Sequence, residues 1–405
     1  MSANPSHPFI VWGSDKGYHI MTPTAPDLSE WSLEHVKHLT PIGSTADGFG
    51  RVVVGASIAA SPDVVPFVSG AMLSNHGRFN GGGAVAMTQV PTGEVANHTA
   101  AYLRDFFKDT GGVGRRSVAL PAAPSTANSS HASMSGGVLA VSNTGANDGK
   151  GEVYVVERRG VALGATDAEW QLTQRLTMGG DTNCGEFGHP ASEYGWSVAT
   201  THWGTQTAAA DDMNAGQLII VGAPGANKAF IYARVGGQLT RAGMTEGGGG
   251  FVCQAQLDAP AGGLFGASVD VDGCCTATVG ARDAEQAYIY TRPDVVSTTW
   301  SLTVTQGNLV PSGSSGITLP TKLGSAVALS NGGRLWVIGA PQQGVNDGGS
   351  FDQQLNGMCQ VHVLSEERDA SIGHNHLATT ATAYDNRWCS TVQAVGSIFA
   401  GGQPR

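Results

Sequence analysis

The stretch FGASVDVDGCCTATVGA, from Phe265 to Ala281, consists of two short apolar segments joined by a polar turn. The same pair returns as LGSAVALSNGGRLWVIGA from Leu323 to Ala340, and as YGWSVAT followed by LIIVGAP between Tyr194 and Pro224. The segments are short, rich in β-branched residues and bounded by Gly, Asn or Asp, which is the signature of β-strands. The repetition therefore predicts a protein built from β-repeats.

Two further segments recur in a fixed order after this pair. One is an alternating run such as KAFIYAR (Lys228 to Arg234), and the other resembles WSLTVTQ (Trp300 to Gln306). No stretch has the 3.6-residue apolar period that is typical of an amphipathic helix. Four strands joined in sequence predict one antiparallel sheet per repeat, and repeats of this length favour a propeller whose blades cover one another's apolar faces.

The predicted fold is one all-β domain over residues 1–405, a β-propeller of about six four-stranded antiparallel blades. This count takes VGRRSVAL (Val113 to Leu120) as the first strand of a repeat, and seven blades follow if residues 121–136 or 181–190 contain degenerate strands. The C-terminal WCSTVQAVGSIFAGG (Trp388 to Gly402) would complete the blade opened by FIVWGSDKGYHIM (Phe9 to Met21). The N- and C-terminal strands would then close the ring in one blade and cover its edges.

The charge balance limits the possible partners. A net charge of −10, from 32 acidic and 22 basic residues, argues against nucleic acid and anionic membranes, which require clustered Lys and Arg. No apolar run approaches the 18 or so residues of a membrane span. The start, MSANPSHPFIVWG, lacks the charged and apolar segments of a secretory signal, so the chain is either not secreted or processed upstream. We therefore expect no nucleic-acid partner and no membrane span.

The six cysteines are too few for a disulfide scaffold in a chain of 405 residues. We therefore expect all of them to be reduced and to pack as small hydrophobic side chains. Neighbouring residues of a strand point to opposite faces, so Cys274 and Cys275 are not expected to bind zinc together.

The spelling F-G, S-V-A and V-G-A-P in this order resembles FG-GAP repeats, as in the propeller heads of integrin α subunits. The resemblance covers essentially the whole chain and is best in Tyr194–Pro224, Phe265–Ala281 and Leu323–Pro341. It implies a propeller, usually of seven blades, at a cell surface, outside the cell or on a virion. It also implies calcium held between the first two strands of a blade, where DVDG (Asp270, Asp272) and DMNAG partly match the pattern of alternating oxygen ligands.

Several residues are candidate ligand contacts. Asp270 and Asp272 lie on the same side of a predicted strand, so their carboxylates could share a calcium ion, and the alternative is an Asp-Gly turn with solvated acids. The sequences GANDGKG and GVNDGGS are expected to form turns, with a ligand contact as the alternative for Asn147, Asp148, Asn346 and Asp347. Trp203 lies in a polar connection and could stack on a sugar. We find no nucleophile elbow and no zinc-protease motif.

Three functions compete. The leading prediction is a non-catalytic recognition or scaffold module that mediates protein–protein contacts in a surface or virus-particle assembly. The second is a lectin that binds a glycan. The third is a hydrolase with acidic residues in the central channel, which a strongly raised carboxylate pKa beside a second acid in a cleft would support. No cofactor other than calcium is expected.

Overall fold

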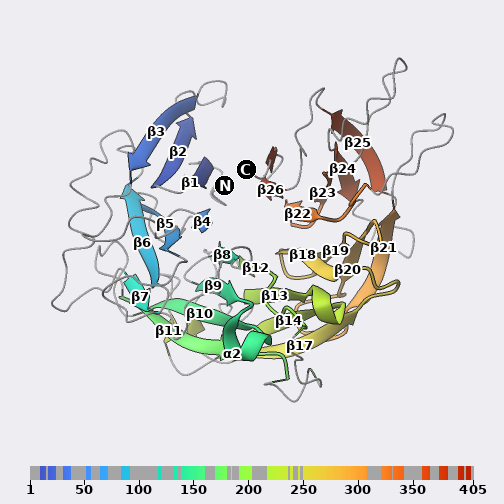
Figure 1. Cartoon of the computed structure of the whole chain (residues 1–405), viewed down its shortest axis with the longest axis horizontal. Helices are drawn as coiled ribbons and strands as arrows, with labels where there is room; N and C mark the ends of the chain where they lie inside the picture. The colour runs from blue at the N-terminus through green and yellow to red at the C-terminus, as the bar shows by residue number, and fades with distance from the viewer. Residues whose placement is uncertain are drawn as a thin grey trace.

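The computed structural model shows an all-β protein whose sheets are set around an axis (Figure 1). It describes residues 10–14, 17–23, 31–37, 52–55, 64–71, 84–91, 117–119, 131–135, 138–159, 169–179, 184, 191–202, 217–235, 238–239, 245–246, 250–307, 321–330, 332–341, 358–364, 374–381, 391–395 and 398–402.

Five of the described sheets have four antiparallel strands each. In chain order their strands are β4 (Val52–Gly55), β5 (Val64–Ala71), β6 (Ala84–Pro91) and β7 (Ser117–Ala119); β8 (Ala132–Ser135), β9 (Val138–Asn143), β10 (Glu152–Arg159) and β11 (Glu169–Leu176); β12 (Ser197–His202), β13 (Gln217–Ala223), β14 (Lys228–Val235) and β17 (Gly250–Asp258); β18 (Phe265–Asp272), β19 (Thr276–Ala281), β20 (Gln286–Thr291) and β21 (Ser301–Gly307); β22 (Ala326–Ser330), β23 (Leu335–Ala340), β24 (Met358–Leu364) and β25 (His374–Ala381). The predicted all-β class and the four-stranded antiparallel sheets are confirmed.

The remaining elements are small. β1 (Ile10–Ser14), β2 (Gly17–Pro23) and β3 (Trp31–Lys37) form a three-stranded sheet, β26 (Thr391–Val395) pairs with β27 (Ile398–Gly402), and β15 (Gln238–Leu239) pairs with β16 (Thr245–Glu246). Two short helical turns are α2 (Ala146–Gly149) and η4 (Pro224–Ala226). Within the described ranges, no helix is long and apolar enough to cross a membrane.

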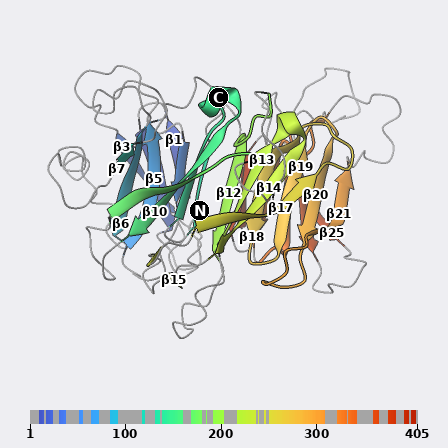
Figure 2. The same ribbon diagram turned by 90° about the horizontal axis from the view of Figure 1, so that it is seen from below.

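The first strand of each four-stranded sheet lies nearest the axis. β4 contacts β8, β8 contacts β12, β12 contacts β18, and β18 contacts β22, so these innermost strands follow one another around the centre (Figure 1). Figure 2 shows the strands from the side, where those of neighbouring sheets stand next to one another. The residues near the start of one sheet therefore lie beside the preceding sheet, which shields them from solvent.

One prediction about an individual strand requires correction, and one open alternative is confirmed. VGRRSVAL contains β7, which pairs with β6 as the fourth strand of its sheet, and is not the first strand of a repeat. The first strand of the following sheet is β8, inside the stretch 121–136. Its sequence ASMS has no β-branched residue, so the strand pattern is absent although the position next to the axis favours small side chains.

The repeated glycines are explained by contacts between neighbouring sheets. Ser268 Oγ donates a hydrogen bond of 2.8 Å to the carbonyl oxygen of Gly324, and Ser197 makes the same contact with Gly266 one sheet earlier. Gly280 of β19 lies against the same carbonyl, because a Cβ atom built there would be 2.0 Å from Gly324 O. The Phe-Gly or Leu-Gly of one sheet and the Gly-Ala of the preceding sheet are therefore two halves of one contact.

The substitution Gly280→Ala is expected to lower the free energy of unfolding by about 2 to 3 kcal/mol, the upper range for overpacking. The new methyl group would meet Gly324 O at 2.0 Å and Ser268 Oγ at 2.3 Å, and the backbone cannot move away without separating the sheets. Urea unfolding followed by tryptophan fluorescence measures the change. Gly307→Ala is the control, because nothing lies within 4 Å of that Cβ position, and equal losses from the two variants would refute the contact.

The prediction that all cysteines are reduced is wrong. Cys184 is bonded to Cys253 across 69 residues with their Cα atoms 5.9 Å apart, and Cys274 is bonded to Cys275. Cys359 is also in a disulfide. Cys274 and Cys275 lie in the turn between β18 and β19, not on opposite faces of a strand, so the turn permits the contact that an extended strand would prevent.

Candidate functional site

Asp270 and Asp272 lie on β18, one of the innermost strands, and their side chains point toward β22 of the next sheet. The alternate residues Val269 and Val271 are buried in the apolar cluster formed with β13, β14 and β19. Because side chains alternate along a strand, burial of the two valines on one face places both acids on the other. The predicted same-side arrangement of Asp270 and Asp272 is therefore present.

Backbone N–H groups from two sheets hold the two carboxyl groups. Asp270 Oδ2 accepts a hydrogen bond of 2.7 Å from Leu329 N of β22, and its Oδ1 accepts one of 2.9 Å from Val271 N. Asp272 Oδ1 accepts from Gly273 N at 2.9 Å, and its Oδ2 accepts from Gly333 N at 3.1 Å. An ionised carboxylate has about four acceptor positions, so each group retains capacity for a further donor such as water.

The environment of Asp270 changes its acidity. Burial between β18 and β22 raises the pKa of Asp270 to about 7, the negative charge of Asp272 adds to this increase, and the hydrogen bonds from Leu329 N and Val271 N oppose it. An ordinary aspartate has a pKa near 3.9. At neutral pH both protonation states of Asp270 are therefore populated, which is the condition for a group that gives and takes a proton during a reaction.

The predicted calcium site lacks a complete ligand set. Ca²⁺ usually takes 6 to 8 oxygen ligands, several of them from carboxylates. In the part of the chain that the structure describes, no group of three or more His, Cys, Asp or Glu residues could hold a metal. Two carboxylates supply only part of such a ligand set, and calcium at Asp270 and Asp272 remains a prediction.

The structure describes the backbone of only two of the five other predicted contacts. Asn147 and Asp148 belong to the helical turn α2 between β9 and β10, and the positive φ angles there belong to Gly149 and Gly151, at 80° and 89°. Asn346, Asp347 and Trp203 lie outside the described residues. Ligand contacts at these five positions remain predictions.

Sequence reasoning missed the donors that orient the acids. Leu329 and Gly333 are 59 and 61 residues away from their partners, on the hairpin between β22 and β23. That hairpin occupies, one sheet later, the place of the turn between β18 and β19. The repeat could have suggested that the turn after β18 lies close to the hairpin after β22. It could not show which backbone N–H groups donate to the carboxylates.

Comparison with known proteins gives matches by structure alone. No protein-family model matches the chain, and no curated protein matches it. A candidate 6-phosphogluconolactonase of Bacteroides fragilis shares 10% identity over 94% of this chain and 84% of its own, with a TM-score of 0.48. The periplasmic gluconolactonase PpgL of Pseudomonas aeruginosa shares 14% over 98% and 99%, with a TM-score of 0.41. The β-propeller domain of Cps50 (Swd1) from Myceliophteria thermophila shares 8% over 100% and 94%, with a TM-score of 0.42.

These similarities concern the fold alone. The leading prediction, a non-catalytic recognition or scaffold module, is not supported, since the similar structures include proteins named as gluconolactonases. The resemblance to FG-GAP repeats stays a prediction, since no family model matches the chain.

Proposed function

We propose that this protein is a hydrolase that uses Asp270 and Asp272, next to the axis of the propeller, as its acid–base pair. The observation that carries the proposal is the juxtaposition of two carboxyl groups on one face of β18, one of which, Asp270, has its pKa raised by burial to about 7. A titratable group shifted by burial and by a specific charged neighbour is a recognised indicator of a functional site.

The spacing of the two residues suits an attack by water. Residues two apart in a strand have Cα atoms about 6.6 Å apart. This spacing is of the same order as the roughly 6.5 to 9.5 Å between the two carboxyl groups of inverting glycosidases, where a water molecule fits between them. Asp272 would take a proton from this water molecule while the water oxygen adds to the substrate. Protonated Asp270 would give its proton to the departing oxygen. One water is consumed, and a second proton transfer between Asp272 and Asp270 through solvent restores the starting state.

The substrate class follows from what such a pair can cleave, namely a bond whose leaving group is an oxygen that requires a proton. Esters within sugar lactones and glycosidic bonds both meet this condition. Sugar lactones are the first substrates to assay, because lactonase names occur among the proteins of similar fold. Glycosides with chromogenic leaving groups are the second panel.

The variant Asp270→Asn is expected to lower kcat on the active substrate by about 100-fold or more, the range for loss of a general acid. In the unaltered protein, kcat/KM is expected to fall as the pH rises through about 7, because Asp270 loses its proton there. The variant is expected to lack this limb of the profile. Initial rates between pH 5 and 9, measured together with the melting temperature, test both points.

Asp283→Asn is the matched control, because it removes the same charge from an exposed position where the carboxyl group pairs with Lys322. It is expected to keep the activity and the pH profile. Equal activity of Asp270→Asn and the unaltered protein, at equal stability, would overturn the proposed role of Asp270. No hydrolysis of any lactone or glycoside by folded protein would overturn the proposed function.

For the architecture, we propose six blades, with the terminal sheets β1–β3 and β26–β27 as parts of one closing blade. The proposal is supported by their incomplete strand number and by their position at the two ends of the chain. Among the strand pairs that the structure describes, none joins these two sheets, so separate blades and a total of seven are the alternative. An experimental structure at a resolution that traces both ends distinguishes the two.

A further inference from the structure

The disulfide between Cys274 and Cys275 does not have the usual stabilising role of a disulfide. A crosslink stabilises chiefly by shortening the loop that the unfolded chain must close, so its effect grows with the number of residues enclosed. Cys184 and Cys253 enclose a long loop, whereas Cys274 and Cys275 are neighbours in sequence. The bond between neighbours can act only on the local backbone, which it fixes in the turn between β18 and β19.

The two described disulfides also differ in access. Cys184 and Cys253 are 2% and 1% exposed and belong to the apolar core between β10 and β14. Cys274 is only half-buried, and Cys275 beside it is 5% exposed. A thiolate must reach a sulfur atom to open a disulfide, so a reductant meets the Cys274 sulfur before it meets the sulfur atoms of the core.

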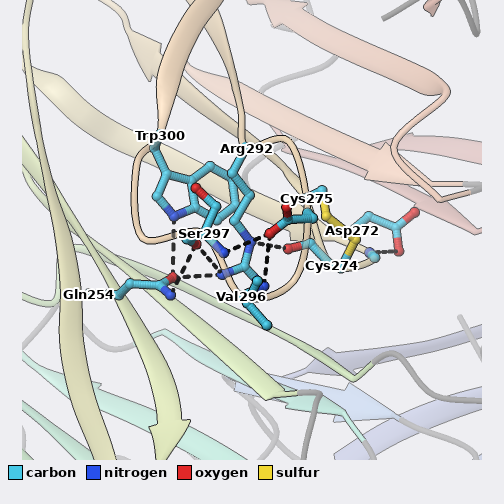
Figure 3. Close-up of a disulfide and its surroundings, with 10 residues drawn as sticks. Gln254, Asp272, Cys274, Cys275, Arg292, Val296, Ser297 and Trp300 are labelled. Carbon is cyan, nitrogen blue, oxygen red and sulfur yellow. Dashed lines mark hydrogen bonds between the residues drawn. A yellow bond between two sulfur atoms is a disulfide. The ribbon is translucent and has the colours of Figure 1, made fainter.

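The turn is connected to the rest of the protein through Arg292, which is buried (Figure 3). Arg292 Nε donates a hydrogen bond of 2.8 Å to Cys274 O, and its backbone N donates one of 3.0 Å to Cys275 O. Its Nη1 donates to Gln254 Oε1 at 2.9 Å and to Ser297 O at 3.1 Å. Arg292 thus connects Cys274 O, through its side chain, to β17 of the preceding sheet and to Ser297, while its backbone N–H holds Cys275 O.

The segment 293–300 exposes two valines, Val295 and Val296. Trp300 lies under the guanidinium of Arg292 at 5.2 Å and donates from Nε1 to Gln254 Oε1. Asp294 Oδ1 accepts hydrogen bonds from Val296 N and Ser297 N, and Val296 is 81% exposed. The position of this exposed valine therefore depends on the Arg292 network, which depends in turn on where the Cys274 and Cys275 carbonyls point.

We propose that the Cys274–Cys275 disulfide is a reversible redox switch, which a dithiol reductant opens and which controls the conformation of the segment 293–300. One thiolate of the reductant attacks the Cys274 sulfur and releases the Cys275 thiolate. The second thiolate of the reductant then displaces Cys274. The reductant leaves as a disulfide, and the two cysteines gain two electrons and two protons as thiols. Opening the bond frees the two carbonyls from a fixed relative orientation and weakens their hydrogen bonds to Arg292.

The test uses the full chain and a small dithiol. The protein is titrated with the dithiol, alkylated, and digested for mass spectrometry, and amide hydrogen exchange of the segment 293–300 is measured on the same samples. The expected result is alkylation of Cys274 and Cys275 at dithiol concentrations that leave Cys184 and Cys253 unlabelled. The amides of Val296 and Ser297, which donate to Asp294 Oδ1, are expected to exchange about tenfold faster, because loss of the hydrogen bond from Arg292 Nη1 to Ser297 O loosens the turn that holds them. Reoxidation is expected to restore slow exchange.

Two variants test whether the disulfide acts on the segment 293–300 through Arg292. The double variant Cys274→Ser with Cys275→Ser is expected to exchange fast in the segment 293–300 without any reductant, and to be insensitive to it. Arg292→Lys keeps the charge but loses the planar fork of donors, so it is expected to uncouple the segment from reduction. If Cys184 and Cys253 are labelled first, or if Cys274 and Cys275 are reduced while exchange of the segment stays slow, the switch is refuted. If the variants do not fold, cysteine labelling and amide exchange of the unaltered protein still test the proposal.

Discussion

Replacing Glu157 by glutamine is expected to lower the free energy of unfolding by about 3 to 5 kcal/mol, the cost of removing one partner from a buried ion pair. Glu157 of β10 meets Arg234 of β14 in the next sheet, with Oε1 and Nη2 2.5 Å apart and side chains that are 2% and 3% exposed. Arg234 also donates from Nε to Gln217 Oε1 at 2.7 Å and lies over the ring of Phe251. In the variant, this buried cation would face a neutral amide.

A double-mutant cycle separates the ion pair from simple loss of packing. The double variant Glu157→Leu with Arg234→Met removes both charges, and well-packed apolar replacements of buried ion pairs are often close to neutral. It is expected to be more stable than either Glu157→Leu or Arg234→Met alone, as judged by urea unfolding. Additive losses from the two single changes would show that the charges do not interact across the two sheets.

Removing the disulfide between Cys184 and Cys253 is expected to destabilise the protein by about 4 kcal/mol, the loop-closure value for a separation of 69 residues. Cys253 is on β17, and Cys184 lies in the connection that precedes β12 of the same sheet, so the bond holds the connection against the outer strand. The double variant with serine at both positions is compared with the unaltered protein by urea unfolding under oxidising conditions.

The Cys274→Ser and Cys275→Ser double variant is the control for this comparison. It removes a disulfide that encloses no loop, and it is expected to lose much less stability. If the two double variants lose the same free energy, the loop-closure explanation is wrong for this protein.

The parts of the fold that could be predicted are those where a local backbone requirement repeats. The Phe-Gly at Phe265 and the Leu-Gly at Leu323 mark sheet starts because both glycines have positive φ angles, 93° and 83°, that other residues rarely adopt. Their partners, such as Gly280, are small because a carbonyl of the next sheet lies against them. β8 was missed because its strand is short and its side chains are small, so no local signal distinguishes it from a loop.

The parts that could not be predicted depend on contacts between distant residues. The period of two along β18 places Asp270 and Asp272 on one face, but the raised pKa of Asp270 comes from burial against β22, about sixty residues later. The pairing of Cys184 with Cys253 depends in the same way on the course of the chain between them. Arg292 gave no signal at all, since its partners come from three separate segments.

Folded Asp270 is expected to exchange its proton near neutral pH. Its carboxyl carbon can be followed by NMR in protein that contains isotope-labelled aspartate, and the signal is assigned by its disappearance in Asp270→Asn. Because the native carboxyl holds its proton to higher pH than the unfolded one, stability should also decline between about pH 4 and pH 7 and then level off. A titration midpoint near 7 is the predicted result, and a midpoint near 4 would contradict the account.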